Sequence, residues 1–226
     1  MKSIRKIVLP GEKLGERRGK KLGENVYVEN KFVFSKVIGI PVVKENEIDV
    51  IPLAGVYIPK VGDKVIGIVT SIEFSGWFVD INSPYTAFLP LAEAVKEFVD
   101  VYRVDLSRYY DIGDVIYCRV IKVGKDKTVQ LSMKYLDNRK LSNGVLVRIT
   151  PYKIPRVIGR GGSMINLIKE KTNCSICVGQ NGIVWIRGRN KAKAIQAILM
   201  VEKESHTIGL TQKIERLLGG RHGRKG

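Results

Sequence analysis

Apolar and polar positions alternate over short distances in roughly the first quarter of the chain, residues 1–54. The segment VYVENKFVFS places two apolar-aromatic runs on either side of Glu29 and Asn30, which predicts a β-hairpin. The segment VIGIPVVKENEIDVIPL continues with two more strand patterns, separated by a polar turn at residues 44–47. A Gly-, Lys- and Arg-rich stretch at residues 11–23 predicts a long mobile loop. This region is therefore expected to be a small β-rich domain.

A second pattern, of five short strands, occupies residues 55–136. The strand segments are DKVIGIVTSI, GWFVDI, TAFLPL, GDVIYCRVIKV and KTVQLSM, with one helix-forming segment, LAEAVKEFV, between the third and the fourth. Gly67 lies inside the first strand, where a barrel strand is expected to bend sharply. This order of elements is typical of an OB-type β-barrel, whose sheet face commonly binds oligonucleotides.

The apolar period changes again in residues 140–207. A strand, GVLVRIT, is followed by a short helical turn, a glycine-rich loop and a helix, SMINLIKEKT. CSICVG and IVWIRG then form a hairpin across a Gln-Asn-Gly turn, and Asn190 is expected to cap a longer helix, KAKAIQAILMVEKES. Residues 208–226 are Gly-rich and basic and predict a flexible tail. The predicted fold class is α+β: a small N-terminal β domain, a five-stranded OB-fold barrel and a C-terminal α/β domain.

The charge balance adds a strong signal, a formal net charge of +17 from 39 Lys and Arg residues against 22 Asp and Glu. A field of this size favours a polyanionic partner, most commonly nucleic acid. No apolar run reaches the roughly 18 residues that a membrane span requires, and no basic amphipathic helix with a broad apolar face stands out. Because the start of the chain also lacks the apolar core of a secretory signal, we expect a cytoplasmic protein with no membrane partner.

The cysteines do not predict a metal site. Cys174 and Cys177 form the segment CSIC, but a structural zinc site needs four ligands. Cys118 belongs to a different domain, and His206 and His222 lack a useful spacing. A redox pair normally opens a helix, whereas this pair lies in a predicted strand. The two cysteines are therefore expected to be packing residues in a reducing compartment, and no metal or cofactor is predicted.

The acidic residues do not form a catalytic cluster. Hydrolytic or phosphorolytic cleavage of RNA needs clustered carboxylates, usually with a metal ion. Here the carboxylates are scattered over predicted turns, as with Glu45 and Glu47 or Asp111 and Asp114. The sequence therefore predicts a binding protein and no enzyme.

The segment RVIGRGGSMINLIKEKT contains the clearest candidate binding site, the loop Gly159-Arg160-Gly161-Gly162. Without Cβ atoms the loop can approach a phosphodiester backbone closely. A helix is expected to begin at Ser163, so its free amides and positive dipole end face the same place. The order strand, short helix, GxxG loop, helix, two strands, helix resembles a KH domain, and KH folds use this loop to hold about four nucleotides. The alternative that the glycines only form a tight turn between helices stays open.

The local charge supports contact between this loop and RNA. From residue 138 to residue 169 there are seven basic residues and no acidic residue. Besides the loop and Ser163, the candidate RNA-binding residues of this domain are Lys153, Arg156 and Arg148.

The middle segment resembles the OB family named after ribosomal protein S-one, through VGDKVIGIV, GWFVDI, AFLPL, YDIGDVIYCRV and TVQLSM. In that family, aromatic residues of the second and third strands stack on bases, and Phe78 and Phe88 match those positions. Trp77 should point to the opposite sheet face. Ser75 and Pro90 depart from the family pattern, so the alternative that both phenylalanines are core residues stays open. The remaining barrel candidates form an electrostatic funnel for a single strand: Arg103, Arg108, Arg119, Lys122, Lys125 and Lys127.

The order of all three domains, including LPGEKLGE and VYVENKFVFSKVIGI near the start, resembles the RNA-binding cap subunit of the archaeal exosome. The resemblance implies a non-catalytic protein that recruits single-stranded RNA for 3'–5' degradation and processing. It implies a cap homotrimer, or one mixed with a zinc-ribbon cap protein, on a hexameric ring of RNase PH-like subunits. It also implies that the OB folds surround the entry pore and that the N-terminal domain holds the ring.

An alternative function within the binding class stays open, that of an OB- and KH-containing transcription elongation or antitermination factor that binds nascent RNA. Such factors have the same domain order but normally carry two KH domains. After Thr207 this sequence leaves no room for a second one.

Overall fold

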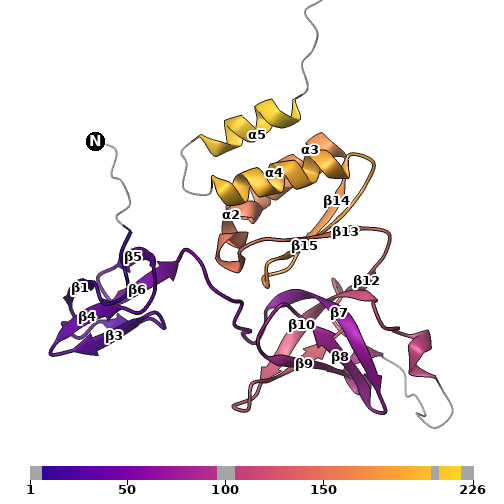
Figure 1. Cartoon of the computed structure of the whole chain (residues 1–226), viewed down its shortest axis with the longest axis horizontal. Helices are drawn as coiled ribbons and strands as arrows, with labels where there is room; N and C mark the ends of the chain where they lie inside the picture. Colours follow the sequence, from indigo (N-terminus) through magenta and orange to yellow (C-terminus); the bar gives the residue numbers. More distant parts are fainter. Residues whose placement is uncertain (1–6, 96–104, 205–208, 220–226) are drawn as a thin grey trace, which may run out of the picture. The chain divides into compact units, whose positions relative to one another are not determined.

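The computed structural model describes residues 7–95, 105–204 and 209–219 of the chain. These residues divide into two compact units, Met1–Gly55 and Val56–Gly226 (Figure 1). The second unit contains both the predicted barrel and the predicted C-terminal α/β domain.

The N-terminal unit consists of two three-stranded sheets around one small core. The first sheet has the order β1 (Lys13–Glu16), β4 (Phe32–Ser35), β3 (Val26–Glu29), and the second has the order β2 (Lys21–Leu22), β6 (Glu47–Pro52), β5 (Gly39–Val43). Strands of both sheets contribute to the buried cluster, which consists of Val8, Val26, Val33, Ile48 and Val50.

Both predicted hairpins of this unit are present. Asn30 and Lys31 turn between β3 and β4 with φ of 47° and 74°, and Lys44 N–H donates to the Glu47 carbonyl at 2.8 Å between β5 and β6. The prediction of one long mobile loop over residues 11–23 is wrong, because β1 pairs with β4 and β2 pairs with β6. Neighbouring strands supply the hydrogen bonds that the local composition does not reveal.

The second unit begins with a closed barrel, as predicted. The strands β11 (Thr128–Ser132), β9 (Thr86–Pro90), β8 (Gly76–Asp80), β7 (Lys64–Glu73) and β10 (Val115–Val123) are neighbours in this order, and a β10–β11 pairing closes the ring. A short strand, β12 (Arg139–Leu141), extends the sheet beyond β10. The barrel interior is filled by apolar side chains that include Val65, Trp77, Leu89, Ile116 and Leu131.

Two details of the barrel differ from expectation. A Cβ at Gly67 would overlap the Val79 side chain, so the glycine is needed for close packing, while the irregularity in strand register lies between Val69 and Ser71. The predicted helix LAEAVKEFV is described only at its start, as α1 (Leu91–Ala94); its remainder lies outside the described residues. A single turn, η1 (Leu106–Arg108), precedes β10.

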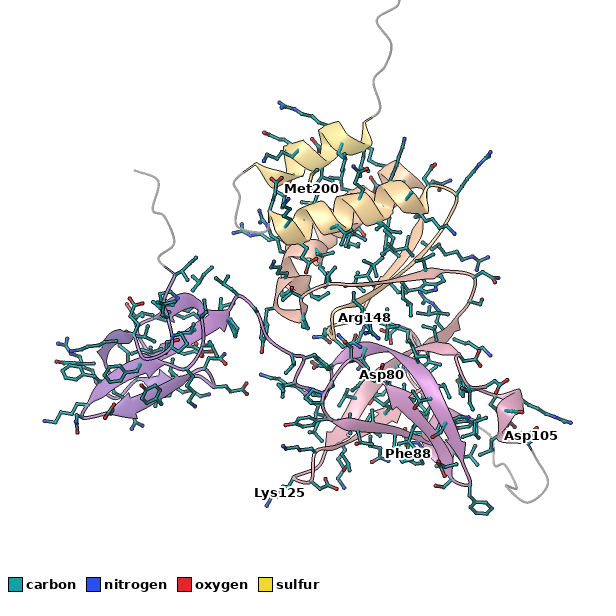
Figure 2. The ribbon with its side chains drawn as sticks, viewed as in Figure 1. Asp80, Phe88, Asp105, Lys125, Arg148 and Met200 are labelled. Carbon is teal, nitrogen blue, oxygen red and sulfur yellow. The ribbon has the colours of Figure 1, made fainter. Side chains whose placement is uncertain are left out.

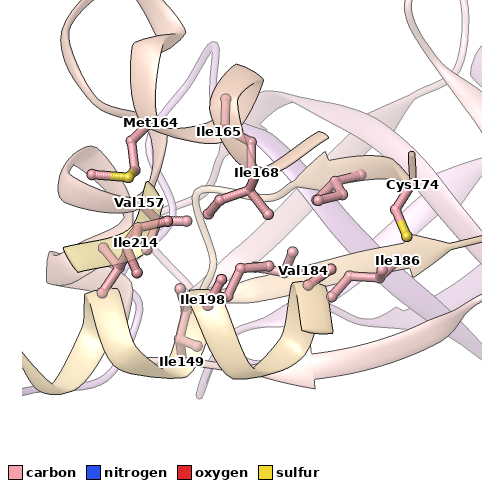
Figure 3. Packing of buried hydrophobic residues seen from close by; sticks show 14 of the residues in the cluster. Ile149, Val157, Met164, Ile165, Ile168, Cys174, Val184, Ile186, Ile198 and Ile214 are labelled. Atoms are coloured by element: carbon pink, nitrogen blue, oxygen red, sulfur yellow. The ribbon is translucent and has the colours of Figure 1, made fainter. Parts of the chain in front are cut away.

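The α/β domain is an antiparallel sheet covered by helices, in the predicted order. The sheet has the order β13 (Val145–Arg148), β15 (Ile183–Arg187), β14 (Ser175–Val178), and the helices are α2 (Ile154–Ile158), α3 (Ser163–Thr172) and α4 (Lys191–Lys203). The short turns η2 (Pro151–Lys153) and η3 (Arg160–Gly162) flank α2. Apolar side chains from the helices and the central strand form the core, among them Ile168, Val184, Ile186 and Ile198 (Figure 3).

The prediction of a flexible tail over residues 208–226 is wrong for most of its length. Leu210–Leu218 form a further helix, α5, which packs on α3 and α4. Leu210, Ile214 and Leu218 recur every four residues, so they lie on one helix face and join the domain core. The glycines and basic residues around this segment masked its apolar period. Residue 208 and residues 220–226 lie outside the described residues.

Asn190 stands at the start of α4 but does not cap it as predicted. Its side chain makes no capping bond to the helix amides. Instead, Asn190 Nδ2 donates to the Thr172 carbonyl at 3.1 Å and ties the start of α4 to the end of α3.

Candidate nucleic-acid interface

The GxxG loop, residues 159–162, turns the chain from α2 into α3 with left-handed backbone at three positions. The φ angles are 76° at Gly159, 57° at Gly161 and 81° at Gly162. Side chains with a Cβ rarely adopt this region, which explains why the segment needs several glycines. The helix α3 begins at Ser163, as predicted.

The glycines of the loop serve two different purposes. A Cβ at Gly159 would lie 2.7 Å from Met164 N, so this position is needed to pack the two helices together. A Cβ at Gly161 would meet nothing within 4 Å. Gly161 is exposed and faces open space, so the protein itself does not require the missing side chain there. Both of the alternatives left open by the sequence therefore hold, each at a different glycine.

The charges beside the loop favour an anion. Arg160 and Ser163 are exposed, the first turn of α3 contains no acidic residue, and no side chain caps its amides. An uncapped helix start carries partial positive charge that attracts phosphate groups. Lys153 is half-buried and Arg156 is exposed on η2 and α2, the elements that lead into the loop.

Arg148 does not belong with these residues, contrary to the prediction. It ends β13 and faces the barrel, where its Nη2 lies 3.7 Å from Asp80 Oδ2 (Figure 2). The ion pair places Arg148 at the joint between the barrel and the KH domain.

The aromatic candidates of the barrel lie on its outer face. Phe78 and Phe88 are half-buried, absent from the core cluster, and their ring centroids are 5.2 Å apart. Trp77, in contrast, is fully buried, and its Nε1 donates to the Tyr110 carbonyl at 2.7 Å. The predicted alternation of Trp77 and Phe78 is confirmed, and the alternative that the two phenylalanines are core residues is wrong.

Strand register extends this aromatic pair into a row across the barrel. Phe78 is opposite Phe88, Phe88 is opposite Gln130, and Gln130 is opposite Lys122. Residues opposite one another in neighbouring strands share a sheet face. We call these four residues the aromatic row. It combines two rings, an amide and a cation, which are the groups that bind a stacked base and its phosphate.

The other cations of the barrel divide into exposed and engaged groups. Arg108, Lys122, Lys125 and Lys127 are exposed. Arg119 is engaged: its guanidinium lies 4.1 Å from the centre of the Tyr135 ring and 3.8 Å from Asp137 Oδ1. It is therefore a structural residue more than a member of a funnel. Arg103 lies outside the described residues.

An acidic residue limits the positive field at the β10–β11 turn. Asp126 Oδ1 accepts hydrogen bonds from Thr128 Oγ1 at 2.8 Å and from Thr128 N at 3.3 Å. These bonds, with a smaller contribution from Lys122, hold the pKa of the Asp126 carboxyl below its usual range. The carboxylate stays charged at neutral pH and offsets part of the charge of the adjacent lysines.

Sequence reasoning missed two residues that matter here. Gln130 had no signal of its own, because its place between Phe88 and Lys122 depends on the parallel β9–β11 pairing. Asn181 was assigned only to a hairpin turn, yet it is fully buried against the barrel.

The chemistry of a metal site or a nuclease is not assembled in the described part of the chain. Within it, no group of three or more His, Cys, Asp or Glu side chains is placed to hold a metal ion. Cys118, Cys174 and Cys177 are all buried and free. Among the same residues, none of the helices has the length and apolar character needed to cross a membrane.

Comparisons with known protein families match each domain separately. Residues 5–54 match the model of the exosome RNA binding protein RRP4 N-terminal domain, residues 58–134 match the S1 RNA binding domain, and residues 145–203 match the KH domain.

Comparisons with whole proteins give long alignments. The chain is 46% identical over 219 residues to the exosome complex component Rrp4 of Pyrococcus abyssi, covering 95% of this chain and 82% of that protein. It is 42% identical over 216 residues to the Rrp4 of Methanothermus fervidus, covering 95% of each chain. A solved structure, a putative exosome complex RNA-binding protein, superimposes with a TM-score of 0.68 at 34% identity and covers 73% of this chain and 96% of that one.

Proposed function

This chain belongs to the family of Rrp4, the RNA-binding component of the exosome complex, and on that basis we propose how it holds RNA and where it docks. It is a non-catalytic RNA-binding subunit, and the family membership does not support the transcription-factor alternative. The proposed role is to bind single-stranded RNA and pass it to a ring of RNase PH-like subunits for 3'–5' degradation.

Gly161 is the observation that carries the proposed RNA contact of the KH domain. It is exposed, its missing side chain would meet no other atom within 4 Å, and it stands one residue from Arg160 and two from Ser163. A backbone without side chain, beside a cation and an uncapped helix start, matches the needs of a closely approaching phosphate.

The barrel supplies a second surface, the aromatic row. Its two exposed ring faces can stack on bases of any sequence, and Lys122 can neutralise a neighbouring phosphate. The row would guide a strand without reading it, as suits a protein that delivers many different RNAs.

The N-terminal unit offers an apolar surface for docking. Val8 is paired with Gly39, and Ile40 is paired with Ile51, so the alternate residues of these three segments point outward together. Ile7, Leu9, Ile38 and Ile51 are between 50% and 58% exposed. We define the outer aliphatic face as Ile7, Leu9, Ile38, Ile40, Ile51 and Leu53. Contiguous exposed apolar residues of this kind mark protein interfaces.

The proposed partner for the outer aliphatic face is the hexameric RNase ring. Three copies of the chain would sit on it, as a homotrimer or mixed with a zinc-ribbon cap protein, in the cytoplasm. A soluble assembly of this kind would bury aliphatic residues that are costly to leave in water.

The RNA contact of the loop is tested with the double substitution Gly161→Asp and Gly162→Asp. Aspartate tolerates left-handed backbone better than most residues, so the fold should persist while two negative charges repel phosphate. We expect RNA affinity to fall about tenfold or more, which corresponds to about 1.4 kcal/mol or more. The matched control is the Asn pair at the same positions, which has the same size without charge and should lose less. Unchanged RNA affinity of a folded Asp variant would overturn the assignment.

Docking is tested by pull-down of RNase ring subunits from native extract. The variant Ile38→Glu with Ile51→Glu should lose the ring and keep the RNA affinity of the isolated chain. Val28→Glu, at an exposed position on the other sheet of the same unit, is the control and should keep the ring. Retention of the ring by the Ile38/Ile51 variant would move the docking role elsewhere.

A further inference from the structure

The joint between the barrel and the KH domain is built on an incomplete strand edge. The strand β7 runs from Lys64 to Glu73, but β8 pairs with it only from Ile68 onward. The backbone groups of Lys64 and Ile66 on that side therefore have no strand partner. Unpaired edges of this kind attract other backbone or amide groups.

A turn of the KH domain, residues 179–182 between β14 and β15, occupies this edge. Gln180 N–H donates to the Lys64 carbonyl at 2.8 Å, and Lys64 N–H donates to Gln180 Oε1 at 2.6 Å. Ile66 N–H donates to Asn181 Oδ1 at 3.2 Å, and Asn181 Nδ2 donates back to the Ile66 carbonyl at 2.7 Å. The Asn181 side chain thus replaces a missing strand residue.

Asn181 also reaches the end of β8. Its Nδ2 donates to the Ile81 carbonyl at 2.8 Å, while Asn82 Nδ2 donates to the Asn181 carbonyl at 3.0 Å. Asn181 is fully buried, so all of these bonds form away from water. A buried amide with every partner supplied fixes one arrangement of the surrounding elements, because any other arrangement leaves polar groups unpaired.

Apolar packing surrounds this polar contact. Ile66 and Leu141 of the barrel sheet share a buried cluster with Cys177, Ile183 and Trp185 of the KH sheet. The Arg148–Asp80 ion pair lies at the same joint, with both side chains partly exposed (Figure 2). The two RNA-binding domains therefore meet through a core of their own.

We propose that Asn181 is a positioning residue for RNA binding, which holds the GxxG loop and the aromatic row in one rigid body so that a single strand engages both. This inference rests on the proposed function of those two surfaces. When one surface has bound, a fixed joint presents the second at a high effective concentration, whereas a loosened joint spreads it over many orientations.

The test measures RNA affinity of the full chain as a function of RNA length. An oligonucleotide of about four nucleotides occupies one surface, since a KH loop holds about four. One of about 20 nucleotides exceeds the requirement of an OB fold, roughly 4–16, and can reach both. Wild type should bind the long RNA on the order of 10²-fold more tightly than the short one. In Asn181→Ala this ratio should fall about tenfold or more, with the short-RNA affinity unchanged.

Two further variants separate positioning from stability. Asn82→Ala removes one bond across the joint and leaves the edge bonds of Asn181, so it should lower the ratio less and serves if Asn181→Ala fails to fold. Asn190→Ala removes a bond of similar length within the KH domain, to Thr172, and should leave the ratio at the wild-type value.

The outcomes distinguish this proposal from the one on which it rests. A wild-type ratio near one, with tight short-RNA binding, or an unchanged ratio in both joint variants would overturn the role of Asn181. An equal fall in Asn190→Ala would also overturn it, by showing an effect of stability alone. Absence of binding to either RNA would overturn the RNA surfaces themselves.

Discussion

The GxxG loop and the aromatic row are proposed to hold the same polymer, but they are built in opposite ways. The loop is a backbone site: it spans four consecutive residues, and its shape depends on left-handed glycines at 159, 161 and 162. The row is a side-chain site: each of its four residues comes from a different strand, and only strand pairing aligns them. A backbone site is sensitive to any added atom, whereas a side-chain site is sensitive to the loss of particular groups.

The difference also appears in how each region combines stability with binding. Within the loop the two demands are separated, since Gly159 packs against Met164 while Gly161 faces open space. In the barrel they are separated by alternation, since Trp77 fills the core and the neighbouring Phe78 faces outward. Each region should therefore yield variants that affect stability and variants that affect RNA binding.

The largest expected effect separates the glycines of the loop. Gly159→Ala should lower the free energy of unfolding by about 3 kcal/mol, from left-handed strain of about 1–2 kcal/mol and overpacking against Met164 of similar size. Gly161→Ala should cost only the strain, about 1 kcal/mol, because its Cβ has space. Thermal or denaturant unfolding of both variants measures the difference. Equal losses would mean that both glycines serve the fold in the same way.

The next effect concerns the rings of the barrel. Phe78→Ala with Phe88→Ala should weaken RNA binding by about 1–3 kcal/mol for each base that stacks there, while the barrel stays folded. Fluorescence anisotropy with a labelled single strand measures the loss. Tyr27→Ala, which removes an exposed ring from the N-terminal unit, is the control and should leave affinity unchanged. An unaltered affinity in the double variant would leave the KH loop as the sole RNA site of the two.

A smaller effect distinguishes the exposed and engaged cations of the barrel. Lys122→Gln should reduce the slope of log affinity against log salt by about 0.7, the value for one phosphate of a single strand. Arg119→Gln should leave the slope unchanged and lower the melting temperature, because this side chain is held by Tyr135 and Asp137. Titrations at several salt concentrations, with melting curves, decide between the two. Reversed results would place Arg119 on the RNA path.

The smallest effect concerns pH and lies at the joint, away from both RNA surfaces. Burial raises the pKa of Tyr117 to about 12, with smaller contributions from Cys177 and Asp137. The folded state therefore favours the protonated phenol, so its contribution to stability is complete below the ordinary pKa of about 10 and is lost as the pH rises towards 12. Tyr117→Phe should reduce the fall in melting temperature across this window and change little below it. Parallel curves for the two proteins would contradict the shift.

The domain order and the loop were predictable because their signals are local. Apolar period, turn residues and the GxxG segment each occupy a few consecutive positions, and the helix start at Ser163 follows directly from them. The failures share a physical cause. The helix α5, the strands β1 and β2 and the bond from Asn190 to Thr172 depend on partners elsewhere in the chain, which no short window contains.

The sequence alone determined the three-domain order, the closed barrel, the KH arrangement and the glycine loop, because each follows from side-chain period or backbone freedom within a short segment. Only the tertiary structure decided that Phe78 and Phe88 face outward beside Gln130 and Lys122, that Arg148 joins Asp80, and that Asn181 completes the edge of β7. Those contacts join residues up to 115 positions apart, and hydrogen bonding between distant strands, which local propensity does not encode, selects which of them form.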